Sequence, residues 1–117
     1  MGIEVRAKAK YVRMSPRKVK LVVDLVRGKH ATEALTMLKF STKAAARPVA
    51  KVIRSAMANA EENYGLSPAE MFVSRIVADE GPTLKRGRFG ARGRFKPILK
   101  RSSHITVVLE SMEEATA

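Results

Sequence analysis

Twelve consecutive residues, 85–96, restrict more than any other stretch what this chain can fold into. They read Lys-Arg-Gly-Arg-Phe-Gly-Ala-Arg-Gly-Arg-Phe-Lys, with six cations, three glycines and no acid. Side chains so rich in like charge repel one another and cannot be buried in an apolar core. This basic segment therefore has to leave the body of the fold, and it becomes favourable beside a polyanion, from which it releases condensed counterions.

The whole chain shares this positive bias. Its 117 residues carry 23 Lys and Arg against 11 Asp and Glu, for a formal net charge of +12. Such a balance predicts an anionic partner, either nucleic acid or an anionic membrane surface. The absence of cysteine excludes disulfides and thiolate metal sites and fits a reducing compartment. No window approaches the roughly 18 apolar residues of a membrane span, so we expect a soluble intracellular protein.

Residues 3–12 alternate between apolar and polar side chains, with the period of two that is typical of a half-buried strand. The polar face carries Glu4 and three cations, so this strand is expected to expose a positive surface. The face expected to point inward carries Ile3, Val5, Ala7, Ala9 and Tyr11.

Two helices are expected next. Ser15 is placed as an N-cap before Pro16 at the first helical position, and Gly28 is placed as the stop. Thr32 is expected to cap a second helix that runs through Phe40. The apolar stripe of the first helix is expected to contain Val19, Leu21, Val22, Val23, Leu25 and Val26.

A third and longest helix is expected from Ser41 or Thr42 to Tyr64-Gly65. Pro48 lies inside this range and lacks an N–H, so it should either bend the helix or delay its regular start. Three cations off the apolar stripe, Arg47, Lys51 and Arg54, are expected to face solvent. The stripe itself comprises Ala45, Val49, Val52, Ile53, Ala56, Met57 and Ala60.

Two strands are predicted at 70–80 and 97–110, separated by Gly81-Pro82 and the basic segment. A connection of this length is unusual unless it is functional, so we expect a basic hairpin over 81–97 that extends from the body. At about 3.4 Å per residue, eight residues on each strand would reach roughly 25 Å. Residues 1–117 are expected to form a single domain, with a frayed tail at 111–117.

The hairpin supplies the first group of candidate nucleic-acid contacts. Its arginines would contact phosphates, while Phe89 and Phe95 would contact bases. The alternative is a disordered, solvated loop, which is the usual state of a charge run, and free in solution the glycines and like-charge repulsion favour disorder. The cations of this group are Lys85, Arg86, Arg88, Arg92, Arg94 and Lys96.

A second group lies on the polar face of the first strand and at the start of the first helix. No acid occurs among residues 6–20, whereas an ordinary soluble surface mixes charges of both signs. This favours contact with phosphates. Lys100 and Arg101 are expected to extend the group from the base of the hairpin. Its other members are Arg6, Lys8, Lys10, Arg13, Arg17, Lys18 and Lys20.

The sequence holds no pattern typical of an enzyme, and no catalytic residue, cofactor or metal is expected. It has two histidines and neither a phosphate-binding loop nor a nucleophile elbow. His104 follows Ser102 and Ser103 and is interpreted as a hydrogen-bonded structural residue.

Four ordered blocks resemble one known family over residues 3–110. They are Met14-Ser15-Pro16-Arg17-Lys18 with Arg27-Gly28, Ala58-Asn59-Ala60-Glu61 with Asn63, Asp79-Glu80-Gly81-Pro82 with Leu84-Lys85-Arg86, and Lys100-Arg101-Ser102-Ser103-His104-Ile105-Thr106-Val107-Val108. The family is that of the bacterial large-subunit ribosomal protein conventionally numbered twenty-two. The resemblance implies an α+β fold, with three helices packed on a small three-stranded antiparallel sheet and a long protruding β-hairpin.

The resemblance also implies a role as a structural constituent of the large subunit of cytoplasmic ribosomes. Such a protein bridges large-subunit rRNA, contacts neighbouring large-subunit proteins, supports assembly, and is a monomer outside the ribosome. In the family the hairpin lines the nascent-peptide exit tunnel and contacts the growing polypeptide passively. Carried over, the tunnel-lining residues are Leu84, Lys85 and Arg86, with Phe89, Gly90, Ala91 and Arg92 at or near the tip.

Two other functions stay open. One is an architectural DNA-binding protein with a β-arm in the minor groove, where Phe89 or Phe95 would act as an apolar wedge. In that case the positive face of the body would have no clear target. The other is an RNA-modifying enzyme, which would need a buried polar cluster around His104.

Overall fold

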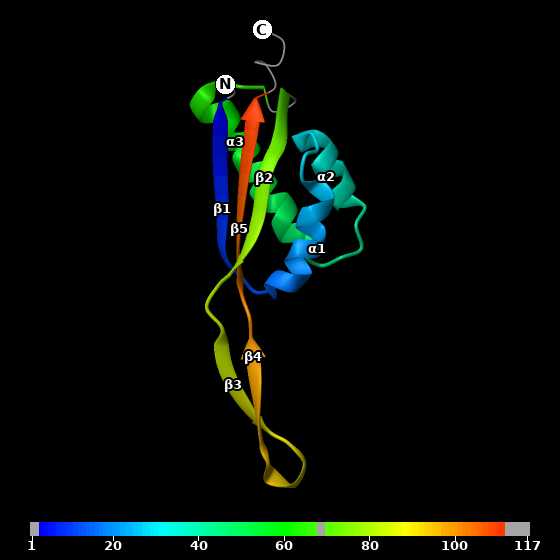
Figure 1. The fold of residues 1–117 in the computed structure, drawn as a ribbon, viewed down its shortest axis with the longest axis vertical. Coiled ribbons are helices and arrows are strands. Elements are labelled where there is room, and N and C mark those ends of the chain that lie inside the picture. Colours follow the sequence, from blue (N-terminus) through cyan, green and yellow to red (C-terminus); the bar gives the residue numbers. More distant parts are fainter. Residues whose placement is uncertain (1–2, 68–69, 112–117) are drawn as a thin grey trace.

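A three-stranded antiparallel sheet in the order β1-β5-β2 organises the computed structural model, which describes residues 3–67 and 70–111. Its α-helices lie together on one face of the sheet (Figure 1). This arrangement confirms the α+β class. Most of the tail predicted to fray, 112–117, lies outside the described residues. The elements are β1 (Glu4–Val12), α1 (Pro16–Val26), α2 (Ala31–Lys39), α3 (Ala46–Tyr64), β2 (Met71–Glu80), β3 (Leu84–Phe89), η2 (Ala91–Gly93), β4 (Phe95–Lys100) and β5 (Ser103–Ser111).

The core forms between the central strand and the helices. Ile105, Val107 and Leu109 alternate along β5 and are fully buried. They lie on the side covered by α1 and α3, whose buried residues include Val22 and Ile53. The strand period of two and the helix period of 3.6 therefore supply matching apolar faces.

Strand β1 follows the predicted alternation through Val5 and Ala7, which are both buried. The prediction for Tyr11 is wrong, because its side chain is 64% exposed and its φ is +59°. The register between β1 and β5 shifts between Ala9 and Val12. An extra residue at a bulge re-aims the side chains that follow it, so Val12 is half-buried in place of Tyr11.

Helix α1 begins at Pro16, as predicted, and Ser15 occupies the N-cap position without a side-chain capping bond. Its buried residues are Val19, Val22, Val23 and Val26, which follow the helical spacing i, i+3, i+4 and i+7. Leu21 and Leu25 fall outside this stripe and are exposed, so their predicted inward position is wrong.

Helices α2 and α3 begin at positions other than those predicted. His30, rather than Thr32, is the N-cap residue of α2. Helix α3 begins at Ala46 instead of Ser41 or Thr42, so Pro48 is only its third residue. The first N–H groups of a helix have no intrahelical acceptor, and the missing donor of Pro48 is therefore tolerated. Of the two predicted effects of Pro48, the delayed start is the one observed.

Strands β3 and β4 form a separate two-stranded antiparallel ladder, paired from Leu84 with Lys100 to Phe89 with Phe95. We call residues 84–100 the arm. It extends away from the body along the longest dimension of the molecule, whose extents are 69 × 25 × 19 Å (Figure 1). Its turn uses two residues with positive φ, Arg92 at 59° and Gly93 at 71°.

The predicted continuous strand at 97–110 is wrong, because β4 ends at Lys100 and β5 begins at Ser103. Residues 81–83 and 101–102, which we call the joint, connect the body to the arm. Gly81 N–H donates to the Ser102 carbonyl at 2.9 Å, and Ser102 Oγ donates to the Pro82 carbonyl at 2.7 Å. The three residues 81–83 lie opposite the two residues 101–102. The pairing of β2 with β5 in the body therefore cannot continue into the pairing of β3 with β4 without a change of register.

Candidate nucleic-acid interface

A concave surface of about 1170 Å³ lies where the arm leaves the body, and we call it the hollow. It is bordered by the end of β1, the start of α1, the connection between α2 and α3, and the joint with the adjoining arm. No acid occurs among its described lining residues. The cations that line it are Arg13, Lys18, Lys43, Arg86, Lys100 and Arg101.

Local structure explains why these cations meet. In β3, residues two apart lie on one face of the ladder, so Leu84 and Arg86 share a side with Lys100, the pairing partner of Leu84. The turn after β1 brings Arg13 to the same place, where Ser103 Oγ donates to the Met14 carbonyl at 2.7 Å. The late start of α3 leaves Lys43 in a connecting segment that also borders the hollow.

The hollow joins the two predicted groups of cations. Arg86 belongs to the hairpin group, whereas the other predicted cations belong to the second group: Arg13 and Lys18 from the body, with Lys100 and Arg101 from the base of the hairpin. Sequence reasoning missed Lys43, because the segment that contains it was predicted to be helical.

The remaining predicted cations do not line the hollow. Those described are exposed: Arg6, Lys8, Lys10, Arg17, Lys20, Lys85, Arg92 and Arg94. The side chains of Arg88, Phe89 and Lys96 lie outside the description.

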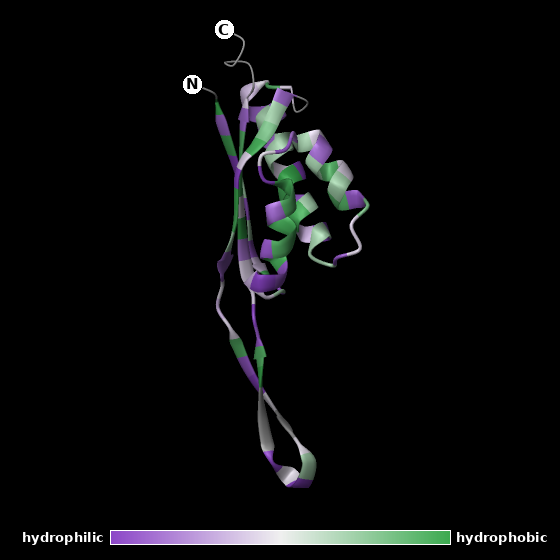
Figure 2. Ribbon diagram, turned by 45° about the vertical axis from the view of Figure 1, so that its right-hand side comes forward, coloured by the Kyte–Doolittle hydropathy of each residue, from purple (hydrophilic) through white to green (hydrophobic). Residues whose placement is uncertain are grey.

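The predicted tunnel-lining set is divided along the arm. Leu84, Lys85 and Arg86 start β3 at the body end of the arm, so they are not part of its tip. Gly90, Ala91 and Arg92 lie at the far turn, directly after Phe89. Near the body, hydrophobic and hydrophilic segments adjoin one another on both strands of the arm (Figure 2).

The hollow is also partly apolar. Tyr11, Leu21, Leu84 and Leu99 are large hydrophobic residues that are exposed and that line it. Exposed apolar side chains that gather at one place are more informative than scattered ones, because they mark a binding surface. The hollow therefore offers apolar contact as well as positive charge.

A second concave surface, of about 1080 Å³, continues the positive surface along α3. It shares Met14, Lys43 and Ala44 with the hollow. Its cations include the three that were predicted to face solvent on α3, and they are exposed. The full set is Lys39, Lys43, Arg47, Lys51 and Arg54, and no described lining residue is acidic.

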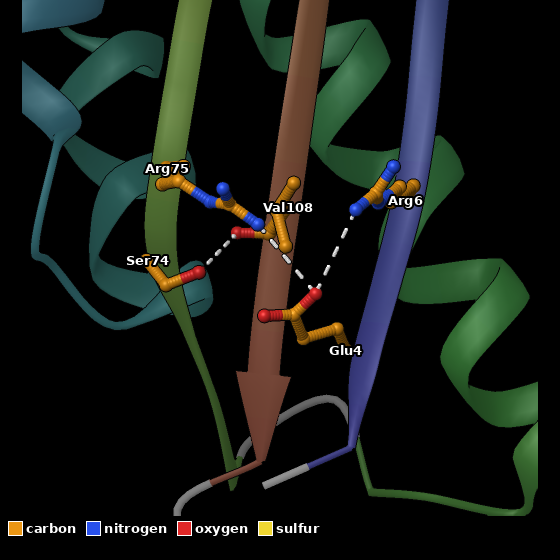
Figure 3. Close-up of polar contacts among 5 residues, drawn as sticks. All are labelled: Glu4, Arg6, Ser74, Arg75 and Val108. Atoms are coloured by element: carbon orange, nitrogen blue, oxygen red, sulfur yellow. Dashed lines mark hydrogen bonds and ion pairs between the residues drawn. The ribbon is translucent and has the colours of Figure 1, made fainter.

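The sheet face opposite the helices mixes charges. Glu4 reaches across β5 and lies 3.5 Å from Arg75 and 3.8 Å from Arg6 (Figure 3). Beside this contact, Ser74 Oγ donates to the Val108 carbonyl at 3.1 Å. The ion pairs are exposed and contribute little to stability. They nevertheless give Arg6 an acidic partner, whereas no acid is found among the described lining residues of the hollow or of the second concave surface.

His104 has the structural role that was predicted. Its Nδ1 accepts a hydrogen bond from the Tyr11 N–H at 3.1 Å, and its ring meets the Tyr11 ring edge to face at a centroid distance of 5.0 Å. Among the described residues, no three His, Asp or Glu side chains form a group that could hold a metal ion. In the same part of the chain, no helix is long and apolar enough to cross a membrane.

The large ribosomal subunit protein uL22 of Thermoanaerobacter sp. (strain X514) is 54% identical over 111 residues, covering 95% of this chain and 100% of that protein. The protein of the same name from Synechococcus sp. (strain JA-2-3B'a(2-13)) is 52% identical over 114 residues, covering 97% and 92%. Residues 7–110 match the family described as ribosomal protein L22p/L17e. The chain therefore belongs to the ribosomal protein L22p/L17e family.

Proposed function

We propose that this protein, a structural component of the large ribosomal subunit, binds large-subunit rRNA through the hollow and the arm. Membership of the L22p/L17e family supports the structural role and a place in translation, in contrast to an enzymatic activity. The observation that carries the RNA-binding part is the hollow itself. Six cations from body and arm converge there, with no acid among the described lining residues.

The proposed mechanism is electrostatic bridging. Two RNA segments brought close together repel each other through their phosphates, and cations placed between them remove that repulsion and release counterions. The hollow is bordered by body and arm, so RNA held there would contact both parts at once. We infer that this bridging supports subunit assembly and that neighbouring large-subunit proteins pack on the remaining surface.

The arm would carry the interaction deeper into the RNA. Its strands pair with each other, so about half of their backbone groups are satisfied within the ladder, and the outward-facing groups of its two edges are left for water or RNA. We propose that the far turn, with Gly90, Ala91 and Arg92 beside Phe89, lines the nascent-peptide exit tunnel and contacts the polypeptide passively. Of the three residues at the body end, Lys85 does not line the hollow, and we assign it to the tunnel side.

A pair of double variants tests the RNA-binding proposal. Lys18→Gln with Lys43→Gln removes two cations from the hollow, while Lys29→Gln with Arg75→Gln removes the same charge from outside it. Binding to a large-subunit rRNA fragment is measured from 50 to 300 mM KCl. The hollow variant is expected to reduce the magnitude of the slope of log K against log salt by roughly 1.4 to 1.8, because each of the two lost phosphate contacts removes roughly 0.7 to 0.9.

The control variant is expected to keep the wild-type slope. Equal losses in both double variants would show that binding depends on total charge rather than on the hollow, and the proposal would be wrong.

A further inference from the structure

The hollow carries a feature that phosphate binding does not require. A positive surface for duplex phosphates needs cations, yet the hollow also exposes four large apolar side chains to solvent. Leu84 and Leu99 come from the arm, Leu21 comes from α1, and Tyr11 comes from β1. An occupant that only presented phosphates would leave this apolar surface in water.

Tyr11 is the most unusual of the four residues. Its φ of +59° is rare for a bulky side chain, and such backbone outliers persist only where the surrounding structure holds them, often at functional sites. The bulge turns its ring out of the core, and the bond from its N–H to His104 Nδ1 fixes the backbone. The edge-to-face contact with His104 then holds the ring in one orientation, with most of its surface exposed.

An aromatic ring surrounded by cations is the arrangement with which proteins bind unstacked bases. The ring stacks on the base, which has an apolar face whatever its identity, and the cations hold the flanking phosphates. Leu21 and Leu84 would cover the rest of the base. A paired duplex cannot use this surface, because its bases are stacked on one another and their faces are inaccessible.

From this geometry we infer that the hollow binds a single unpaired nucleotide of RNA, whose base stacks on Tyr11 between the exposed leucines. The inference rests on the proposed RNA-binding function and adds the kind of RNA structure that the hollow selects: a bulge or a looped-out residue rather than a regular helix. The six cations of the hollow are the reason to favour RNA over an apolar segment of a neighbouring protein.

The test compares two RNA stems that differ in one nucleotide. In one stem a single 2-aminopurine is unpaired, and in the other the same 2-aminopurine is paired, so that the two RNAs carry nearly the same charge. The full-length protein is expected to bind the bulged stem about tenfold more tightly, which is the order expected of one base–aromatic stacking contact. Fluorescence of the unpaired 2-aminopurine is expected to fall on binding, because stacking quenches it.

Substitutions then assign the preference to Tyr11. Tyr11→Leu removes the ring and keeps an apolar side chain, so it is expected to abolish the roughly tenfold preference for the bulged stem. Tyr11→Phe keeps the ring and is expected to retain the preference. Tyr64→Leu is the matched control, because Tyr64 is also exposed but lies at the end of α3 and does not line the hollow.

The outcomes separate the inference from the proposed function. Equal binding of both stems by the wild-type protein, with strong salt dependence, would overturn the inference and leave RNA binding intact. If the protein bound neither stem, both the inference and the proposed RNA-binding function would be overturned. A photoreactive residue at position 21 in assembled ribosomes gives a second readout. Its crosslinking to RNA supports the inference, and its crosslinking to a neighbouring protein instead would refute it.

Discussion

Replacing Ser103 by alanine is expected to lower the free energy of unfolding by about 1 to 3 kcal/mol. Ser103 is fully buried, and its Oγ donates to the Met14 carbonyl at 2.7 Å. The substitution removes the donor and leaves that carbonyl without this partner, at a bond that is partly buried. The loss is a substantial fraction of the total free energy of unfolding, which is roughly 5 to 15 kcal/mol for a typical domain. The same bond ties the start of β5 to the turn that precedes α1.

Urea unfolding followed by circular dichroism measures this loss. The urea concentration at the midpoint of unfolding is expected to fall. The slope of the free energy of unfolding against urea concentration should stay unchanged, because the surface exposed on unfolding is nearly the same. Ser55→Ala is the matched control, since Ser55 is exposed on α3 and should change stability by no more than about 0.5 kcal/mol. A Ser103→Ala protein as stable as the Ser55→Ala protein would refute the reasoning.

Three further substitutions test the joint, the core and the start of α3. Gly81→Ala places a Cβ 2.6 Å from Ser102 Oγ and should cost about 1 to 2 kcal/mol in urea unfolding, since that hydroxyl must leave the Pro82 carbonyl. In a Ser102→Gly background, Gly81→Ala should cost less than it does in the wild-type protein, because only the contact of the new Cβ with the His104 ring at 3.2 Å remains, and fully additive losses would contradict the contact with Ser102. Ile53→Ala empties a fully buried position and should cost about 2 to 5 kcal/mol, so a loss below about 1 would contradict the packing. Pro48→Ala should change stability by less than about 1 kcal/mol, whereas a stabilisation near 3, expected of a proline inside a helix, would contradict its place in the first turn.

Local patterns were enough to predict most elements of the body. The alternation of β1 and the helical spacing of the valines in α1 each identify one buried face, because burial depends there on period alone. The start of α1 at Pro16 and the end of α3 at Tyr64 follow from residues whose backbone preferences are strong. Gly65, with a φ of +64°, is an example.

Two of the errors occurred where a neighbouring strand decides the structure. Nothing in residues 3–12 shows that Tyr11 turns outward, because the bulge arises from how β1 pairs with β5, more than 90 residues later. The break between Lys100 and Ser103 likewise depends on the unequal lengths of the two sides of the joint. In both places the pairing across the sheet outweighs the pattern along the chain.

The candidate site was predicted as two groups of residues and not as one place. Charge runs identify cations near the start of the chain and cations near residue 100, but only the fold brings them to a common surface. Lys43 could not be found in this way, because it lies outside both runs. The apolar part of the hollow was also hidden, since Leu21 and Tyr11 were both predicted to face inward.

The most direct test of the central claim is to irradiate living cells, isolate this protein, and sequence the RNA crosslinked to residues that line the hollow and to residues 85–96. Our account predicts large-subunit rRNA, with crosslinks from Arg13 and Lys18 of the body and from Lys100 of the arm falling on RNA segments that meet in the folded subunit. Crosslinks spread over unrelated transcripts or chromosomal DNA would contradict it, and would favour a general architectural binder of nucleic acids.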